Sequence, residues 1–116
     1  MNVEEIREYC LSKKGVEESF PFDETTLVMK VLGKIFIFIP LERSHSISLK
    51  FPPEDVEDLR DRYPEVTSAY HLSKKHWNAL SLDGALSHQQ IKDWIDQSYY
   101  LVVSKLPKKY KETLNE

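Results

Sequence analysis

Cysteine is nearly absent from this sequence, with Cys10 the single copy among 116 residues. One cysteine excludes an intrachain disulfide and a cysteine-rich zinc site, and it is typical of a reducing compartment. Long apolar runs are also missing, because the longest, IFIFIP at 35–40, is too short to cross a bilayer and suits a buried strand. The first ten residues, MNVEEIREYC, lack the pattern of a signal peptide, so we expect a cytoplasmic protein with no membrane attachment.

Glycine is scarce as well, and its three copies stand alone, so the sequence has no glycine-rich loop that would cradle a phosphate. None of the serines sits in a G-x-S-x-G elbow, and Cys10 falls on the apolar stripe of an expected helix, where a thiol is usually inert. The sequence therefore offers no catalytic residue and no cofactor site, and we expect a protein that is not an enzyme.

The composition is that of a globular protein, with 41% hydrophobic and 30% charged residues. Because the chain has no repeat, linker or low-complexity tract, we expect residues 1–116 to form a single domain. The net charge is −3, which argues against a generic polyanion-binding protein. The charge is nevertheless sorted along the chain: residues 25–52 carry four basic and one acidic side chain, whereas residues 53–66 carry two and six.

Hydrophobic periodicity predicts elements in the order αβββαββαα. Helical patterns fall at 3–13, at 54–63, from Ser87 to Pro107 and in a short basic segment after Pro107, and strand patterns fall at 27–31, 34–39, 45–51, 66–71 and 76–82. This order indicates an α+β fold, an antiparallel sheet with helices packed mainly on one face. In the loop FPF at 20–22 we expect both aromatic rings to fold back onto the core.

Two histidines stand out in the stretch AYHLSKKHWNALSLDG at 69–84. His71 and His76 are five positions apart, which separates them on a strand and on a helix alike, and no cysteine or acidic residue between them completes a ligand set. Asp83 has the chemistry to orient His76, but no oxyanion hole is evident nearby. We therefore expect hydrogen-bonded imidazoles at a strand entrance, and no metal site.

The strand that follows sets Trp77 and Asn78 on opposite faces of the sheet. If Leu80 points inward, then Asn78 does too, and its buried amide needs hydrogen-bond partners. Trp77 then lies on the outer face, unless a bulge reverses the alternation.

A basic sheet face is the main candidate for binding. Strand alternation presents Lys30 and Lys50 on an outer face beside hydroxyl groups, and the loop at 73–78 adds further lysines and an aromatic ring that can stack on a base. The side chains expected to contact nucleic acid are Lys30, Lys50, Lys74, Lys75, His76, Trp77 and Asn78. The alternative interpretation is that lysines on strand exteriors only keep the protein soluble and protect its edges.

An acidic stripe marks the helix expected at 54–63, where Glu54, Asp58 and Asp61 share one side. Three carboxylates on one helix face can collect hard cations weakly. Such a stripe is more commonly a solvated helix surface, and Arg62 stands four residues after Asp58 to neutralise part of it.

The chain resembles the MmcQ/YjbR family of small bacterial proteins through segments that span nearly its full length in order: EEIREYCLSKKGVEESFPF, TLVMKVLGKIFIFI, ISLKF, YHLSKKHWNALSLDG and SYYLVVSKLPKK. The resemblance implies a CyaY-like α+β fold and a likeness to double-wing DNA-binding domains. It brings no catalytic residue and no cofactor. The positions that match the family's signature are Pro21, Phe22, Lys50, Tyr70, His71, Lys74, Lys75, His76, Trp77, Asn78, Asp83 and Gly84.

The leading hypothesis is a cytoplasmic bacterial protein, monomeric and not enzymatic, that binds DNA weakly and in a salt-dependent way through the basic sheet face and the loop at 73–78. One alternative is a protein-binding or small-ligand-binding module that uses Trp77 and the Phe20–Phe22 loop. Another is weak metal binding on the acidic helix at 54–62.

Overall fold

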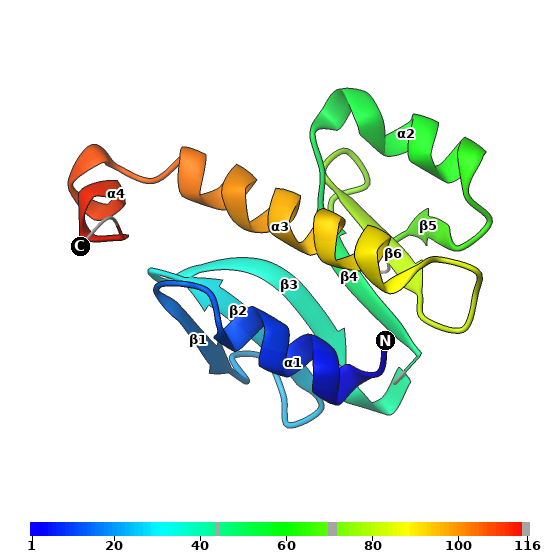
Figure 1. The fold of residues 1–116 in the computed structure, drawn as a ribbon, viewed down its shortest axis with the longest axis horizontal. Helices are drawn as coiled ribbons and strands as arrows, with labels where there is room; N and C mark the ends of the chain where they lie inside the picture. The colour runs from blue at the N-terminus through cyan, green and yellow to red at the C-terminus, as the bar shows by residue number, and fades with distance from the viewer. Residues whose placement is uncertain (44, 70–71, 115–116) are drawn as a thin grey trace.

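The computed structural model describes residues 1–43, 45–69 and 72–114, and within them a six-stranded sheet forms one layer and helices form the other (Figure 1). The helices are α1 (Val3–Leu11), α2 (Pro53–Arg62), α3 (His88–Ser104) and α4 (Lys108–Leu114), with a 3-10 turn η1 at Leu41–Arg43. The strands are β1 (Val16–Ser19), β2 (Thr26–Val31), β3 (Lys34–Pro40), β4 (Ser46–Lys50), β5 (Val66–Ser68) and β6 (Trp77–Ser81). No helix within these ranges is both long and apolar enough to span a membrane.

The strand order is β1-β2-β3-β4-β6-β5, and every neighbouring pair is antiparallel. This arrangement confirms the α+β fold class. The order of elements differs from the prediction by one additional strand, β1, whose sequence VEES contains a single apolar residue and therefore carries no strand pattern. The expected strand at 66–71 ends at Ser68, and its last two positions lie outside the described residues.

The hairpin between β2 and β3 turns at Leu32 and Gly33. Both residues have positive φ angles, 47° and 85°. A two-residue hairpin favours this left-handed conformation because it matches the twist of the flanking strands, and glycine adopts it without a steric cost.

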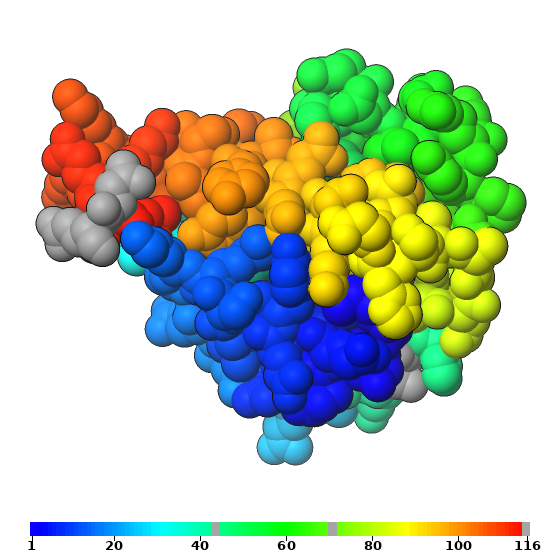
Figure 2. Space-filling view, viewed as in Figure 1, coloured from blue at the N-terminus to red at the C-terminus, as the bar shows by residue number. Residues whose placement is uncertain are grey.

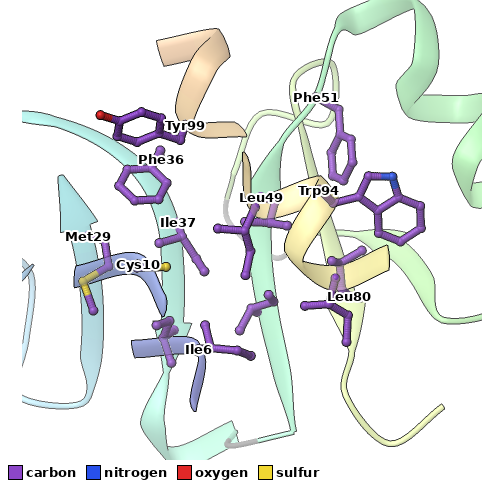
Figure 3. Close-up of a cluster of buried hydrophobic side chains, with 14 of the residues drawn as sticks. Ile6, Cys10, Met29, Phe36, Ile37, Leu49, Phe51, Leu80, Trp94 and Tyr99 are labelled. Carbon is purple, nitrogen blue, oxygen red and sulfur yellow. The ribbon is translucent and has the colours of Figure 1, made fainter. Parts of the chain in front are cut away.

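A bulge in β3 explains why this strand is apolar on both sides. Met29 pairs with Ile37 and Lys30 pairs with Ile35, so Phe36 is an extra residue in the ladder. The bulge lets Phe36 and Ile37 both enter the core, where each is fully buried (Figure 3). Phe38, the next residue, is half-buried and belongs to the opposite face.

The core lies between the sheet and the helices α1 and α3. Figure 1 shows α1 and α3 over the same face of the sheet, and in Figure 2 their surfaces adjoin. Tyr9 on α1 donates to Asp96 on α3, with the two oxygens 2.6 Å apart. α1 begins with a capping box, since the Asn2 side chain accepts from the Glu5 amide and the Glu5 side chain accepts from the Asn2 amide. α3 packs on the sheet through a buried stripe of residues spaced three and four apart: Ile91, Trp94, Ile95, Ser98, Tyr99 and Val102.

Candidate functional site on the open face of the sheet

The sheet has an open face, defined here as the side turned away from α1 and α3. In β4, Ile47 and Leu49 are fully buried toward the helices, whereas Ser48 and Lys50 alternate with them and stay partly exposed. A groove runs over this open face, and none of its lining residues belongs to an α-helix. The open face is therefore the surface on which the fold leaves side chains available to a ligand.

An aromatic row lies on the open face. The rings of Phe22 and Phe38 are stacked with centroids 6.1 Å apart, and Phe38 meets Trp77 edge to face with centroids 5.1 Å apart. Trp77 reaches Phe38 across β4, where the small Ser48 pairs with Phe38 and leaves room for the indole. Trp77 thus lies on the outer side of the sheet, as the alternation of its strand predicts when Leu80 points inward.

The prediction that the FPF loop folds onto the core is wrong. Phe20 is 48% exposed and Phe22 is 66% exposed. The loop is held outside because the Asp23 side chain accepts from the backbone amides of Thr25 and Thr26, at 2.9 and 2.7 Å. Phe22 consequently joins the open face and covers Phe38 instead of entering the core.

Asn78 is a structural residue, which corrects its expected role in contacting nucleic acid. Its side chain is fully buried, with Nδ2 donating to the carbonyl oxygen of Val56 at 3.1 Å. Its Oδ1 accepts from Nε of Arg60 at 2.6 Å. Because the side chain is fully buried and both of its polar atoms are hydrogen-bonded inside the protein, a ligand on the surface cannot reach it.

Arg60 was not identified by the sequence reasoning, although it organises the lysine-bearing turn at 73–76. Its guanidinium also donates to the carbonyl oxygens of Lys74 and Trp77, at 2.7 and 3.3 Å. The available signal was its position four residues after Val56, which places it on the side of α2 that turns toward the sheet.

The turn itself is compact and presents its lysines outward. The carbonyl oxygen of Ser73 accepts from the amides of His76 and Trp77, and the carbonyl oxygen of His76 accepts from the Phe51 amide at 2.9 Å. The bond from the His76 amide to the Ser73 carbonyl oxygen keeps His76 in the turn, so β6 begins at Trp77, one residue later than predicted. Lys74 and Lys75 are both exposed.

Three lysines contribute positive charge near His76: Lys50 on β4, Lys75 in the turn and Lys105 at the C-terminal end of α3. We define Lys50, Lys75, His76 and Lys105 as the basic end, which joins one end of the open face to the C-terminus of α3. Burial lowers the pKa of the His76 imidazole first, and the charges of Lys50, Lys105 and Lys75 lower it further. Burial, followed by the charge of Lys105, also lowers the pKa of Lys50. Lys105, which caps the C-terminus of α3, was not predicted from the sequence because it lies 29 positions after His76 and 55 after Lys50 along the chain.

Two of the predicted basic contacts stand apart from this cluster. Lys30 lies two strands from Lys50 in the sheet order and pairs with Glu17 on β1, whose charge opposes its own. Lys74 is adjacent in sequence to the basic end, but its main role in the fold is to offer its carbonyl oxygen to Arg60.

The other end of the open face carries the groove, which has a volume of about 920 Å³. Its walls and floor include four acidic side chains, Asp23, Glu42, Glu65 and Asp83. Nδ1 of His45 lies 3.0 Å from a carboxylate oxygen of Asp83, so Asp83 pairs with this histidine and does not orient His76. We call this region the acidic groove. Positive and negative charges on the open face are therefore separated along the strand direction, with the basic end at one end and the acidic groove at the other.

Within the described part of the chain, the acidic helix considered for weak metal binding does not gather its carboxylates into a cluster of metal ligands. Glu54, Asp58 and Asp61 on α2 are all exposed to solvent. Across the residues that the structure describes, no three His, Cys, Asp or Glu side chains come together in a way that would hold a metal ion. His71, the partner of His76 in the histidine hypothesis, lies outside the described residues together with Tyr70.

The fold and the site define a small two-layer α+β protein whose open sheet face carries aromatic, basic and acidic side chains in separate zones. The YjbR family model matches residues 11–101. The chain is 35% identical over 115 residues to the uncharacterized protein YjbR of Escherichia coli K12, and the match covers 98% of both proteins. It is also 32% identical over 107 residues to the uncharacterized protein YbdF of Escherichia coli O157:H7, covering 91% of this chain and 88% of that protein.

Solved structures show the same architecture. The crystal structure of the Deinococcus radiodurans protein DR2400, with a DUF419 domain, superimposes with a TM-score of 0.89 at 34% identity, covering 98% of this chain and 88% of that one. A Pseudomonas syringae protein superimposes with a TM-score of 0.73 at 28% identity, covering 87% of this chain and 98% of that one. The chain therefore belongs to the YjbR family, as its sequence motifs indicate.

Proposed function

We propose that this protein binds nucleic acid at the basic end of the open face, with a preference for single strands, and that it acts in the cytoplasm as a monomer without catalysing a reaction. The observation that carries the proposal is the position of the Phe38–Trp77 pair beside the lysines around His76. Proteins that bind single strands combine a positively charged track for the backbone with aromatic rings on which bases stack.

The charge around His76 supports the phosphate contact. Lys75 and Lys105 are exposed, the charge of Lys50 lowers the pKa of His76, and the charge of Lys105 lowers the pKa of Lys50. A phosphate among these lysines offsets their mutual repulsion, and its neutralisation releases condensed counterions from the nucleic acid, which is the usual source of salt-dependent affinity. His76, whose pKa is lowered, is mainly neutral at pH 7 and contributes a hydrogen bond instead of a charge.

The acidic groove at the other end of the same face favours a single strand over a duplex. A duplex laid across the open face would bring one of its two backbones toward Glu42 and Asp83, where like charges repel. A single strand can follow the basic end alone and stack a base on Trp77. We therefore expect a short binding site, with contacts to about three phosphates and weak, salt-sensitive affinity.

The test is fluorescence anisotropy with labelled single-stranded and double-stranded oligonucleotides over a salt series. Contacts to three phosphates of a single strand predict a log–log slope of the binding constant against salt of about −2. The variant Lys75→Glu with Lys105→Glu is expected to abolish binding. A control is Lys92→Glu, which reverses one lysine charge away from the basic end, where Nζ lies 5.3 Å from the centre of the Tyr9 ring; it is compared with Lys75→Glu alone, which reverses the same charge at the basic end.

Circular dichroism and the melting temperature confirm that each variant is folded. No binding at low salt would overturn the proposal, and so would an equal loss of affinity in the Lys92→Glu control. A tighter complex with the duplex than with the single strand would overturn the expected preference. Lys74→Glu with Lys75→Glu, which changes the turn itself, is expected to weaken binding in the same direction.

A further inference from the structure

The acidic groove has the length of a short extended peptide. Its lining residues come from five neighbouring strands, β2, β3, β4, β6 and β5. Neighbouring strands lie about 4.8 Å apart, so the four intervals between them span roughly 19 Å. At about 3.3 Å per residue, this length fits an extended segment of about six residues that crosses the strands.

The depth of the groove follows from the short side chains on its floor. Ser48 on β4 and Ala79 on β6 pair with one another on the open face, and Ser46 pairs with Ser81 in the same two strands. Larger side chains border this floor, with Phe22 and Phe38 at the β2–β3 side. The result is an open trough with an aromatic wall. It is not an enclosed cavity of the kind that buries most of a compact metabolite.

Four carboxylates follow one long side of the trough. Asp23 precedes β2, Glu42 follows β3, Asp83 follows β6 and Glu65 precedes β5. Because neighbouring strands are antiparallel, these four strand termini lie at the same end of the strands, across the width of the sheet. Among the described residues that line the groove there is no lysine or arginine, and the single histidine, His45, is already paired with Asp83.

Local hydrogen bonds fix two of these carboxylates in place. Asp23 accepts from Thr25 and Thr26, which lowers the pKa of its carboxyl group. Oε2 of Glu65 accepts from the Ala85 amide at 2.9 Å. Fixed anions beside exposed aromatic rings suit the side chains of Arg and Lys, whose cationic heads pair with carboxylates and whose stems cover aromatic surface.

We propose that the acidic groove docks an extended basic segment of a partner protein, about six residues long, in which Arg or Lys alternates with small or apolar residues. In such a segment the alternate side chains point to the same side about 6.6 Å apart. Basic side chains on one side then reach the row of carboxylates, while the others rest on Ser48, Ala79 and the Phe22–Phe38 wall. The groove has the opposite charge from the nucleic-acid site and shares Phe38 with it. Its test changes Phe22 and the carboxylates, which the nucleic-acid site does not use, so the two proposals can fail separately.

The test is a binding titration with a fluorescein-labelled hexapeptide, Arg-Ser-Arg-Val-Arg-Ser, measured by anisotropy at low salt. The variant Glu42→Gln with Glu65→Gln removes two negative charges and retains an oxygen that can accept from Ala85, and it is expected to weaken peptide binding at least tenfold. Phe22→Ala is expected to weaken it several-fold. The matched control is Glu54→Gln with Asp58→Asn, which removes the same charge from the exposed side of α2 and is expected to change binding less than twofold.

Three outcomes would overturn the proposal. The first is no saturable binding of the basic peptide, or equal binding of a peptide with Glu in place of Arg. The second is spermine binding as tightly as the peptide with no dependence on Phe22, which would assign the groove to a small polyamine. The third is a concentration-dependent dimer in light scattering that the peptide does not dissociate. If Glu42→Gln with Glu65→Gln abolishes this dimer, the groove would be assigned to a second copy of the chain.

Discussion

The Arg60 guanidinium donates to the buried side chain of Asn78, with Nε 2.6 Å from Oδ1. The same guanidinium donates to the carbonyl oxygens of Lys74 and Trp77. One side chain of α2 therefore fixes both the first residues of β6 and the turn that carries Lys75. Part of the family motif at 69–84 is thus structural, because Asn78 and the backbone of Lys74 and Trp77 anchor the turn to α2.

Replacement of Arg60 by leucine is expected to destabilise the protein by about 1.5–3 kcal/mol, because it removes a charged donor and leaves the buried Oδ1 of Asn78 without a partner. The measurement is urea unfolding followed by Trp fluorescence. The same variant is expected to weaken nucleic-acid binding at the basic end, since the turn that presents Lys75 loses its anchor.

Arg62→Leu is the matched control for Arg60→Leu. Arg62 lies two residues further along α2, and its side chain is 64% exposed in a 3.5 Å pair with Asp58. An exposed pair of this kind contributes at most about 0.5 kcal/mol, so the control is expected to unfold nearly as the wild type does. An equal loss of stability in both variants would contradict the role assigned to Arg60.

Ser98 joins the bulge of β3 to the end of β4. Its Oγ donates to the Phe36 carbonyl oxygen at 2.6 Å and accepts from the Lys50 amide at 2.9 Å. Ser98→Ala leaves both backbone groups without this partner inside the protein, so we expect a loss of about 1–3 kcal/mol in the free energy of unfolding. Ser104→Ala serves as the control, because Ser104 is exposed and bonds only within α3, and a comparable loss there would rule out the bridging role.

Strong periodicity made part of the fold predictable. The stripe of α3, with the small polar Ser98 in it, follows from spacing of three and four residues, and the alternation of β6 correctly separates Trp77 from Asn78 once Leu80 is placed inside. The bulge at Phe36 could not be predicted, because a strand that is apolar on both sides carries no signal for a change of register.

The candidate site was less predictable because it depends on contacts between distant segments. Of the predicted lysines, Lys50 and Lys75 belong to the basic end, but Lys30 lies two strands away from Lys50. The third lysine of the basic end, Lys105, comes from the end of α3 and was not predicted. The acidic groove depends even more on topology, since its four carboxylates come from four separate connections that the antiparallel strand order brings to the same end of the strands.

Burial raises the pKa of the Cys10 thiol to about 12, which keeps the thiol protonated and unreactive in the folded protein. We expect Ellman's reagent at pH 8 to label native protein slowly, at a rate that rises with urea in parallel with unfolding. Fast labelling of the native protein would show that the thiol is accessible and would contradict this expectation.

The same raised pKa links Cys10 to stability at high pH. The unfolded thiol ionises near its ordinary pKa of about 8.5 and the folded thiol near 12, so the contribution of Cys10 is complete below about pH 8.5 and is lost as the pH rises toward 12. The comparison of wild type with Cys10→Ala across this range isolates the thiol from the tyrosines that also titrate there. Identical pH profiles of the two proteins would refute the linkage.

The pKa of His76 is expected to lie below its ordinary value of about 6.5, because burial and then the charges of Lys50, Lys105 and Lys75 oppose its protonation. As the pH falls below 6.5, the unfolded chain takes up the proton first, so the contribution of this group to stability is lost as the pH falls through the folded-state pKa. The measurement is an NMR titration of the imidazole resonances, with His76→Gln used for assignment.

Lys105→Gln removes one of the three opposing charges and is expected to raise the pKa of His76 toward 6.5 without reaching it, because burial, the largest cause, remains. Lys92→Gln removes the same charge on the helix side, beside the Tyr9 ring, and is expected to leave the titration unchanged. A short oligothymidylate is expected to raise the pKa of His76 as well, because a phosphate among the lysines offsets their charge. A titration midpoint that stays constant in Lys105→Gln would mean that the lysine is too far from the imidazole to form one basic end with it.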